Sequence, residues 1–289
     1  MSGRYGLGLV LAAGVAIAAA AFFVSSGHVL ELAVVGTYTI AILGLGQLLS
    51  QGGTVSLGQG AFMALGGYTT AILCAHHGVG QLWTIPAAAC VAGAAGLVAG
   101  VISLRLGTLS PGIVTLGLAL VVAPIAVRFE AFTGGASGLA LPDRPLDARQ
   151  AYALTWALAA GLFLLAWRRS GRSARGNPVA SFGLSGAYAG VAGSLLVINV
   201  GRVAPGTFSV RLSLLLLAGA AVCGLGSVWG APIAALLIRY LADLTGSLPH
   251  IGSQRPGPTT FLFGVAVIVL VVGRGMAAAF NQRFKRAGP

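Results

Sequence analysis

The chain has 289 residues, of which 57% are hydrophobic and only 8% charged, and its mean hydropathy is +0.93. A soluble domain carries about 25% charged residues, so this composition excludes an ordinary water-soluble fold. The formal net charge of +12 would suggest nucleic-acid binding in a soluble protein, but the basic residues here lie mostly in short connections between apolar segments. We therefore expect an integral membrane protein with no nucleic-acid partner.

Apolar segments long enough to cross a bilayer recur along the whole chain. Crossing about 30 Å of hydrocarbon takes about 20 helical residues, and the segments lack the alternation of a transmembrane barrel. The sequence thus predicts an all-α polytopic membrane protein, one transmembrane domain over residues 1–289, with eight to ten membrane helices including broken or half-helices. The predicted spans are residues 6–24, 29–49, 60–76, 83–104, 111–128, 150–167, 181–200 and 260–273. A further apolar stretch, residues 212–244, is either two short crossings or a pair of half-helices.

The distribution of Arg and Lys between the connections predicts the orientation, because basic residues near span ends stay on the cytoplasmic side. One set of alternate connections holds Arg4, Arg105, four arginines within residues 168–175 and a basic tail at residues 274–289. The opposite set mixes its basic and acidic residues, and its longer connections include Arg202, Arg211 and Arg255. We therefore expect both termini to be cytoplasmic.

Residues 44–62, GLGQLLSQGGTVSLGQGAF, combine glycines with polar side chains at membrane depth. Irregular backbone is tolerated there only where protein buries it or where it lines a wet cavity. Ser56 can cap a helix running through Gln59 and Phe62, and the N-terminus of such a half-helix attracts the anionic part of a solute. The segment is either a pathway wall or an ordinary surface loop. The candidate pathway residues are Gln47, Ser56, Gln59 and Phe62, with Gly224, Gly226 and Ser227 as a matching break in the second half.

Two glycine pairs have a different meaning. Gly96 and Gly100 form one GxxxG pair, and Gly186 and Gly190 form another. This spacing lets helix backbones approach closely in lipid. We expect both pairs to mark helix packing.

Few charged residues fall within the predicted spans. Glu31 lies near the outer end of the second span, and Arg239 and Asp243 have the four-residue spacing of an ion pair on one helix. No convincing carboxylate lies near the midplane, where a proton-coupled carrier would usually need one. Lys285 is the only lysine, so there is no phosphate-binding loop of the GxxxxGK type. We predict no catalytic residue, no metal site and no cofactor, with any ATPase on another polypeptide.

Several motifs in order resemble one known family. The stretch GQLLSQGGTVSLGQGAFMALGGYTTAIL resembles the GxxSLGxxAFxxxGAYT segment of branched-chain amino acid ABC permeases. SLRLGTLSPGIVTLGLALV is similar to their LRLxGxxxxIVTLG segment, and TGGASGL to their LTGGxxGL segment. The last two motifs favour the M-type subunit over its H-type sister. The resemblance covers about residues 30–275.

The resemblance implies one subunit of a multi-subunit importer in the bacterial inner membrane. An H-type permease subunit would complete the pore within the lipid bilayer, and two cytoplasmic ATPase subunits would bind beneath. A periplasmic substrate-binding protein would deliver a branched-chain or related small amino acid. Two alternatives are a relative that inserts but cannot couple ATP to transport, and a passive channel or carrier for a small solute such as urea.

The cytoplasmic loop at residues 168–180 departs from the family pattern. In the family this loop carries the coupling helix, which fits a groove on the ATPase. Here RRSGRSARGNPVA matches the basic start, but the next span follows at once. Gly176 and Pro178 further disfavour a helix. The remaining coupling contact is predicted at Arg172, Arg175, Asn177 and Pro178, unless the basic tail replaces it or the arginines only set orientation.

Overall fold

A computed structural model describes residues 26–106, 110–142, 146–170, 177–223 and 228–244. Its α-helices are α2 (Ser26–Gln47), α3 (Gln59–His77), α4 (Gln81–Leu106), α5 (Ser110–Arg128), α6 (Glu130–Thr133), α7 (Ala148–Ser170), α8 (Pro178–Val200), α9 (Val210–Cys223) and α10 (Gly230–Leu244). The short elements are a π-helical turn η1 (Leu48–Gly52), the 3-10 turns η2 (Gly135–Ser137) and η3 (Pro205–Phe208), and the paired strands β1 (Leu139–Ala140) and β2 (Arg202–Val203). The predicted helical membrane fold is confirmed.

The long helices follow the predicted spans closely. Within the described ranges, five helical segments are long and apolar enough to cross a membrane: 28–52, 81–103, 111–128, 148–169 and 178–200. The predicted span at residues 60–76 corresponds to α3, which has 19 residues. The predicted spans at residues 6–24 and 260–273, and the basic tail at residues 274–289, lie outside the described residues.

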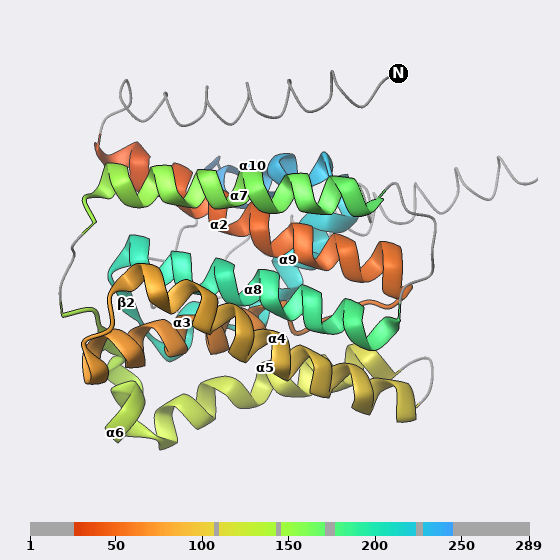
Figure 1. Ribbon diagram of the computed structural model, residues 1–289, viewed down its shortest axis with the longest axis horizontal. Helices are drawn as coiled ribbons and strands as arrows, with labels where there is room; N and C mark the ends of the chain where they lie inside the picture. Colours follow the sequence, from red (N-terminus) through yellow and green to blue (C-terminus); the bar gives the residue numbers. More distant parts are fainter. Residues whose placement is uncertain (1–25, 107–109, 143–145, 171–176, 224–227, 245–289) are drawn as a thin grey trace, which may run out of the picture.

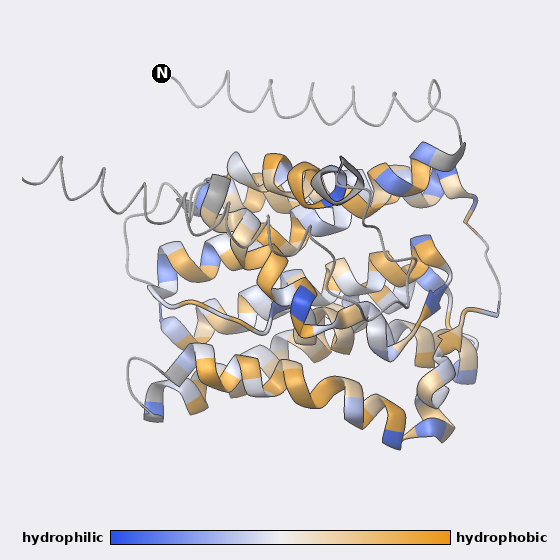
Figure 2. Cartoon of the chain, turned by 180° about the vertical axis from the view of Figure 1, so that it is seen from behind, coloured by the Kyte–Doolittle hydropathy of each residue, from blue (hydrophilic) through white to orange (hydrophobic). Residues whose placement is uncertain are grey.

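Helix α8 runs through the centre of the bundle (Figure 1). Helices α2 and α7 lie along one side of it, α4 and α5 along the other, and α3 packs against it. The span of α8 is 89% buried, whereas that of α5 is only 28% buried. Apolar residues cover the outer helices, and hydrophilic residues gather mainly toward the ends of the bundle (Figure 2). This distribution suits a bundle whose outer helices face lipid and whose ends face water.

The contact between α4 and α8 depends on the two predicted glycine pairs. A Cβ on Gly186 would lie 2.4 Å from the carbonyl oxygen of Ala92, and one on Gly190 would be equally close to α4. Gly96 and Gly100 meet the first turns of α8 from the opposite side, with Cβ positions 2.4 Å and 3.0 Å from its atoms. The two pairs therefore face each other across one interface, and the packing role predicted for them is confirmed.

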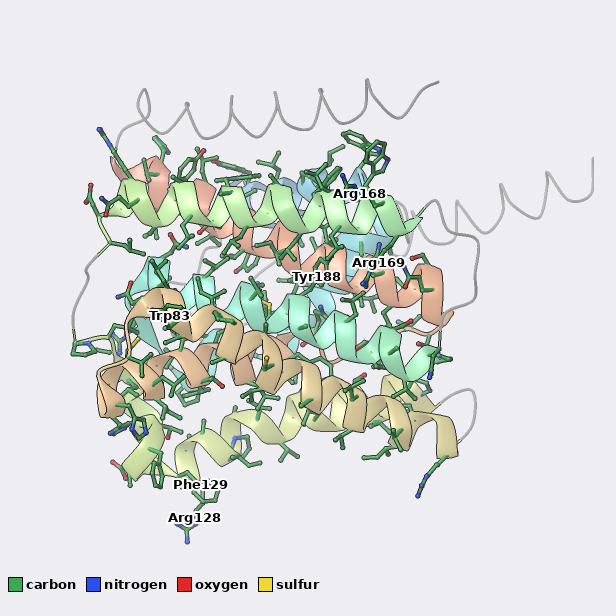
Figure 3. All side chains as sticks on the ribbon, in the orientation of Figure 1. Trp83, Arg128, Phe129, Arg168, Arg169 and Tyr188 are labelled. Atoms are coloured by element: carbon green, nitrogen blue, oxygen red, sulfur yellow. The ribbon has the colours of Figure 1, made fainter. Side chains whose placement is uncertain are left out.

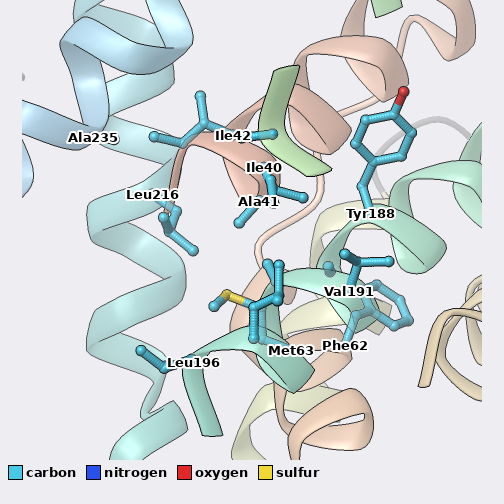
Figure 4. Packing of buried hydrophobic residues seen from close by; sticks show 14 of the residues in the cluster. Ile40, Ala41, Ile42, Phe62, Met63, Tyr188, Val191, Leu196, Leu216 and Ala235 are labelled. Carbon is cyan, nitrogen blue, oxygen red and sulfur yellow. The ribbon is translucent and has the colours of Figure 1, made fainter. Parts of the chain in front are cut away.

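Helix α3 approaches α8 even more closely. A Cβ on Gly193 would lie only 1.8 Å from the carbonyl oxygen of Met63, and one on Gly66 would lie 2.2 Å from the Gly190 carbonyl oxygen. Around this crossing, Phe62, Met63 and other buried side chains fill the space between α2, α3 and α8 (Figure 4). The backbone of α3 is thus held directly against the central helix.

The two ends of the bundle carry different groups of charges. Helices α4 and α7 end where α5 and α8 begin (Figure 1). Arg168 and Arg169 lie at that end, whereas Arg128 and Phe129 lie toward the other (Figure 3). The first two arginines of the predicted 168–175 cluster thus lie at one end of the bundle.

An ion pair joins α10 to α2. The Nη2 of Arg239 donates to Oε1 of Glu31 at 3.0 Å, and Nδ1 of His28 lies 3.4 Å from Oε2 of the same carboxylate. Asp243, the predicted partner of Arg239, has a side chain outside the described part of the chain. Glu31 therefore links two helices that are far apart in sequence.

Candidate functional site

The segment of residues 44–62 contains a break between α2 and α3. Helix α2 passes into the π-helical turn η1, residues 53–58 are not helical, and α3 begins at Gln59. Gly53 has φ +64°, a left-handed conformation that glycine adopts without steric cost. Short π-helical turns are frequent at functional sites. The predicted break is present, and it is confined to the few residues between Gly52 and Gln59.

Helix α3 begins inside the bundle rather than at its end. The Nε2 of Gln59 donates to the carbonyl oxygen of Ala41 at 3.0 Å, and its Oε1 accepts from the Ser185 hydroxyl at 3.3 Å. Ala41 lies near the midpoint of the 28–52 span. The first turn of α3 is therefore at mid-depth, where discontinuous helices of transporters commonly meet their substrates.

Hydroxyl groups satisfy the backbone N–H groups at this break. The Leu57 N–H donates to the Thr115 hydroxyl at 2.9 Å, and the Gly60 N–H donates to the Ser213 hydroxyl at 2.9 Å. Such internal partners are required where backbone leaves a helix at membrane depth. The break is therefore exposed at its beginning, at Gly53 and Val55, and enters the bundle interior only from Ser56 to Gln59.

The capping role predicted for Ser56 is wrong. The residue before the first turn of α3 is Gly58, which has no capping side chain. The Ser56 hydroxyl instead accepts the Gly58 N–H at 3.3 Å. The helix begins later than the local pattern suggested, because Gln59 and Gly60 form hydrogen bonds with residues of other helices.

The predicted pathway residues of the first half are all covered by neighbouring helices. Gln47 is tied to the last turn of α7, where its Nε2 donates to the Ala166 carbonyl oxygen at 3.3 Å. Its Oε1 accepts from Nε2 of Gln51 at 2.7 Å. The exposed fractions are 2%, 1%, 0% and 0% for Gln47, Ser56, Gln59 and Phe62. Gln59 lies at the junction of α2, α3 and α8, whereas Gln47 lies between η1 and α7.

The π-helical turn also touches the beginning of α8. A Cβ on Gly52 would lie 3.3 Å from the Cβ of Ser181. Together with the Gln47 to Ala166 hydrogen bond, this contact attaches η1 to both helices that flank the basic loop. The end of α2 and the π-helical turn thus contact the two helices on either side of the basic loop.

Of the second predicted break, only the helices on either side lie within the described residues. Gly224, Gly226 and Ser227 lie outside the described residues. Helices α9 and α10 on either side have 14 and 15 residues, which correspond to about 21–22 Å. They pack side by side, and a Cβ on Gly219 would lie 2.7 Å from Cδ1 of Ile238. These lengths fit both predicted alternatives, two short crossings or a pair of half-helices.

A second helix start at mid-depth was missed from the sequence. Helix α9 begins after Ser209, whose carbonyl oxygen accepts the N–H of Leu212 at 3.0 Å. Its first turn contacts the first turn of α3 through Gly60 and Ser213. Arg211 consequently lies in a membrane helix, and its placement in an outer connection is wrong. The signal was present, since Ser209 precedes a long apolar run and follows a Pro–Gly turn.

The basic loop is shorter than predicted. Helix α7 continues to Ser170 and α8 begins at Pro178, so both ends of the predicted 168–180 loop are helical. Arg172 and Arg175 lie outside the described residues.

Asn177 and Pro178 belong to the start of α8. The Oδ1 of Asn177 accepts the Val179 N–H at 3.0 Å, so Asn177 is the N-cap. Pro178 occupies the first helical position, where the missing N–H costs nothing. Asn177, the residue before this proline, is not helical (φ −59°, ψ 120°), which agrees with the expectation that Pro178 disfavours a helix in the loop that precedes it.

Comparisons with known proteins agree with this architecture. The sequence profile of the family described as "Branched-chain amino acid transport system / permease component" matches residues 28–177 and 165–272. The chain is 29% identical over 274 residues to the "High-affinity branched-chain amino acid transport system permease protein LivM" of Escherichia coli (strain K12). It is equally similar to the protein of the same name from Salmonella typhimurium (strain LT2).

In both comparisons the similarity covers 77% of this chain and 64% of the relative, so the chain spans less than two thirds of the length of these relatives. No solved structure matches the chain. The family profile nevertheless covers most of the chain, including α2, the break, α3, α8 and α9. The chain therefore belongs to the family of branched-chain amino acid transport system permeases.

Proposed function

We propose that the chain is the M-type permease subunit of an ABC importer for branched-chain or related small amino acids. Its role is to carry the solute across the bacterial inner membrane, driven by ATP that separate subunits hydrolyse. Family membership supports transport. The observation that carries the proposal is the start of α3 at mid-depth, where Gln59 contacts both α2 and α8.

The solute route passes the junction of α2, α3 and α8. Gln59, Ser185 and Ser213 supply hydrogen-bonding groups there, and Phe62 supplies an apolar surface. In the described conformation these polar groups bond to one another or to backbone, so the route is closed. It opens when the first turn of α3 moves away from α2. The second-half residues Gly224, Gly226 and Ser227 are proposed as the matching wall.

The end of the bundle that carries Arg168 and Arg169 is proposed to be cytoplasmic. Basic residues near span ends stay on that side, and Arg105 ends α4 at the same end. The basic loop and η1 then face the ATPases, and the β1–β2 pair faces the periplasm. Both termini are cytoplasmic in this orientation.

The partners are an H-type permease subunit, two ATPase subunits and a periplasmic substrate-binding protein. Only residues 171–177 separate α7 from α8, too few for a coupling helix of several turns. We place the ATPase contact on Arg172 and Arg175, held in position by Asn177 and Pro178 at the start of α8. The same short loop favours a second candidate function, a relative that inserts normally but does not couple ATP to transport.

The experiment is uptake of labelled leucine into proteoliposomes that contain the chain with its four partner subunits. We expect uptake to require ATP and the binding protein. A double variant, Arg172→Ala with Arg175→Ala, should lose ATPase association, whereas Arg202→Ala at the opposite end should retain it. ATPase recovery without any uptake would support the uncoupled relative. Equal uptake with and without ATP would contradict the importer and indicate a passive carrier.

A further inference from the structure

Arg211 lies in the first turn of α9, in the membrane interior. The two serines that flank it along the helix, Ser209 and Ser213, both lie against Gly60 at the start of α3. The neighbouring Gln59 is hydrogen-bonded opposite the midpoint of the 28–52 span. Because one helical residue rises only about 1.5 Å, the backbone of Arg211 is within a few ångströms of that depth.

The guanidinium group of Arg211 lacks a protein partner among the described residues. Its Nε is buried and has no hydrogen-bond acceptor. The two ion pairs of the described ranges both use Glu31, with His28 and Arg239. A cation at membrane depth is costly, and such residues face a cavity or a pathway and pair with a charged group. Arg239 pairs with the carboxylate of Glu31, whereas Arg211 has no carboxylate partner among the described residues.

Arg211 lies at the edge of the core of this chain, with its Nε buried and an exposed residue one turn further along the helix. Leu212 and Leu216 on the inner side are 7% and 0% exposed, whereas Leu214 is 47% exposed. Arg211 and Leu214 are three residues apart and therefore share a face of the helix. Two permease subunits that form a pore between them would present such a face to the solute or to each other.

Two properties of this position favour an anion. The start of α9 carries the positive end of the helix dipole. A guanidinium group presents paired donors that match the two oxygens of a carboxylate. Every amino acid substrate carries an α-carboxylate, whatever its side chain.

We infer that Arg211 binds the carboxylate of the amino acid as it passes between the two permease subunits. The inference rests on the proposed function, and it names the group on the solute that the permease recognises. Arg211 forms an ion pair with that carboxylate at mid-depth, and α3, whose first turn lies beside α9, closes the site on one side.

The test measures binding to the assembled permease pair in lipid nanodiscs with three probes. Leucine has both charged groups, 4-methylpentanoate keeps the carboxylate without the amino group, and leucinamide replaces the carboxylate with a neutral amide. We expect leucinamide to bind much more weakly than the two carboxylates. Arg211→Gln should weaken binding of both carboxylates by about 10- to 100-fold, the effect of losing a hydrogen-bonded charge, and leave leucinamide unchanged.

Two variants control for misfolding. Arg211→Lys keeps the positive charge and should retain part of the preference for carboxylates, and Arg202→Gln removes an exposed arginine at the end of the bundle and should change nothing. Unchanged binding of 4-methylpentanoate to Arg211→Gln would overturn the inference. The variant could also fail to assemble with its partner subunit and yet bind carboxylates normally once the pair is cross-linked. That result would overturn the inference and indicate that Arg211 pairs with an acidic side chain of the partner.

The probes separate this inference from the proposed function. Arg211-dependent binding of 4-methylpentanoate without binding of leucine would support the carboxylate site and contradict an amino acid substrate. Binding of leucine that does not depend on Arg211 would support an amino acid substrate and contradict the carboxylate site.

Discussion

The close crossing of α3 and α8 predicts a large effect for a single methyl group. In Gly193→Ala the new Cβ would lie 1.8 Å, 2.6 Å and 2.9 Å from O, C and Cα of Met63. All three atoms are backbone, so no side chain can rotate away. The helices would have to separate by about 1.2 Å before the closest of these contacts became tolerable.

The energetic cost follows from that separation. A gap of about 1 Å forfeits up to half of the dispersion energy between facing atoms, and overpacking of a buried contact costs about 1–3 kcal/mol. We expect the upper end of this range, because both surfaces are rigid. The better helix propensity of alanine offsets about 1 kcal/mol, which leaves about 2 kcal/mol, or a roughly 30-fold rise in the unfolding equilibrium constant.

The assay is thermal or denaturant unfolding of the purified protein in detergent, with Gly161→Ala as the matched control. Gly161 also lies in a membrane helix, but a Cβ there would meet no atom within 4 Å. We expect Gly193→Ala to unfold at a temperature lower by about 4–8 °C and Gly161→Ala to be unchanged or more stable. Equal stability of the two variants would refute the close approach of α3 to α8.

Three further predictions test other contacts. Gln59→Leu should destabilise the protein by about 1–3 kcal/mol, because it leaves the Ser185 hydroxyl without its acceptor. Denaturant unfolding measures this loss of stability, and an unchanged unfolding midpoint would contradict the hydrogen bond between Ser185 and Gln59. Glu31→Gln and Arg239→Gln should show a coupling energy of about 1 kcal/mol in a double-mutant cycle, and additive effects would exclude the ion pair. Trp83, 77% exposed at the start of α4, should be quenched by lipids brominated near the headgroup; quenching only by water-soluble reagents would place it outside the membrane.

Most of the architecture could be predicted from the sequence because the bilayer imposes strong local rules. The predicted spans at residues 29–49, 83–104, 111–128, 150–167 and 181–200 correspond to long apolar helices of the structure. The GxxxG spacing was likewise sufficient to predict close packing. Such features depend only on runs of apolar residues and on the spacing of glycines.

The details of the candidate site could not be predicted, because they depend on contacts between distant residues. The start of α3 is fixed by Ser213, which lies 153 residues further along the chain, and by Ala41 on the preceding helix. Local reasoning assigned the cap to Ser56, whereas α3 begins after Gly58, which has no capping side chain. Arg211 was assigned to an outer connection for the same reason: Ser209 marks the start of a helix in the sequence, but the contact of that helix with the start of α3 involves Gly60, which is distant in sequence.

The attachment of η1 to both flanks of the basic loop limits how that loop can act. Gln47 is bonded to the end of α7, and Gly52 abuts Ser181 at the start of α8. With only a few residues between them, the two helix ends cannot swing independently. A push on this end of the bundle must tilt α7 and α8 together, and the end of α2 must follow or lose the hydrogen bond from Gln47. A short loop can therefore transmit force by displacing helix ends as one body, without a separate helix of its own.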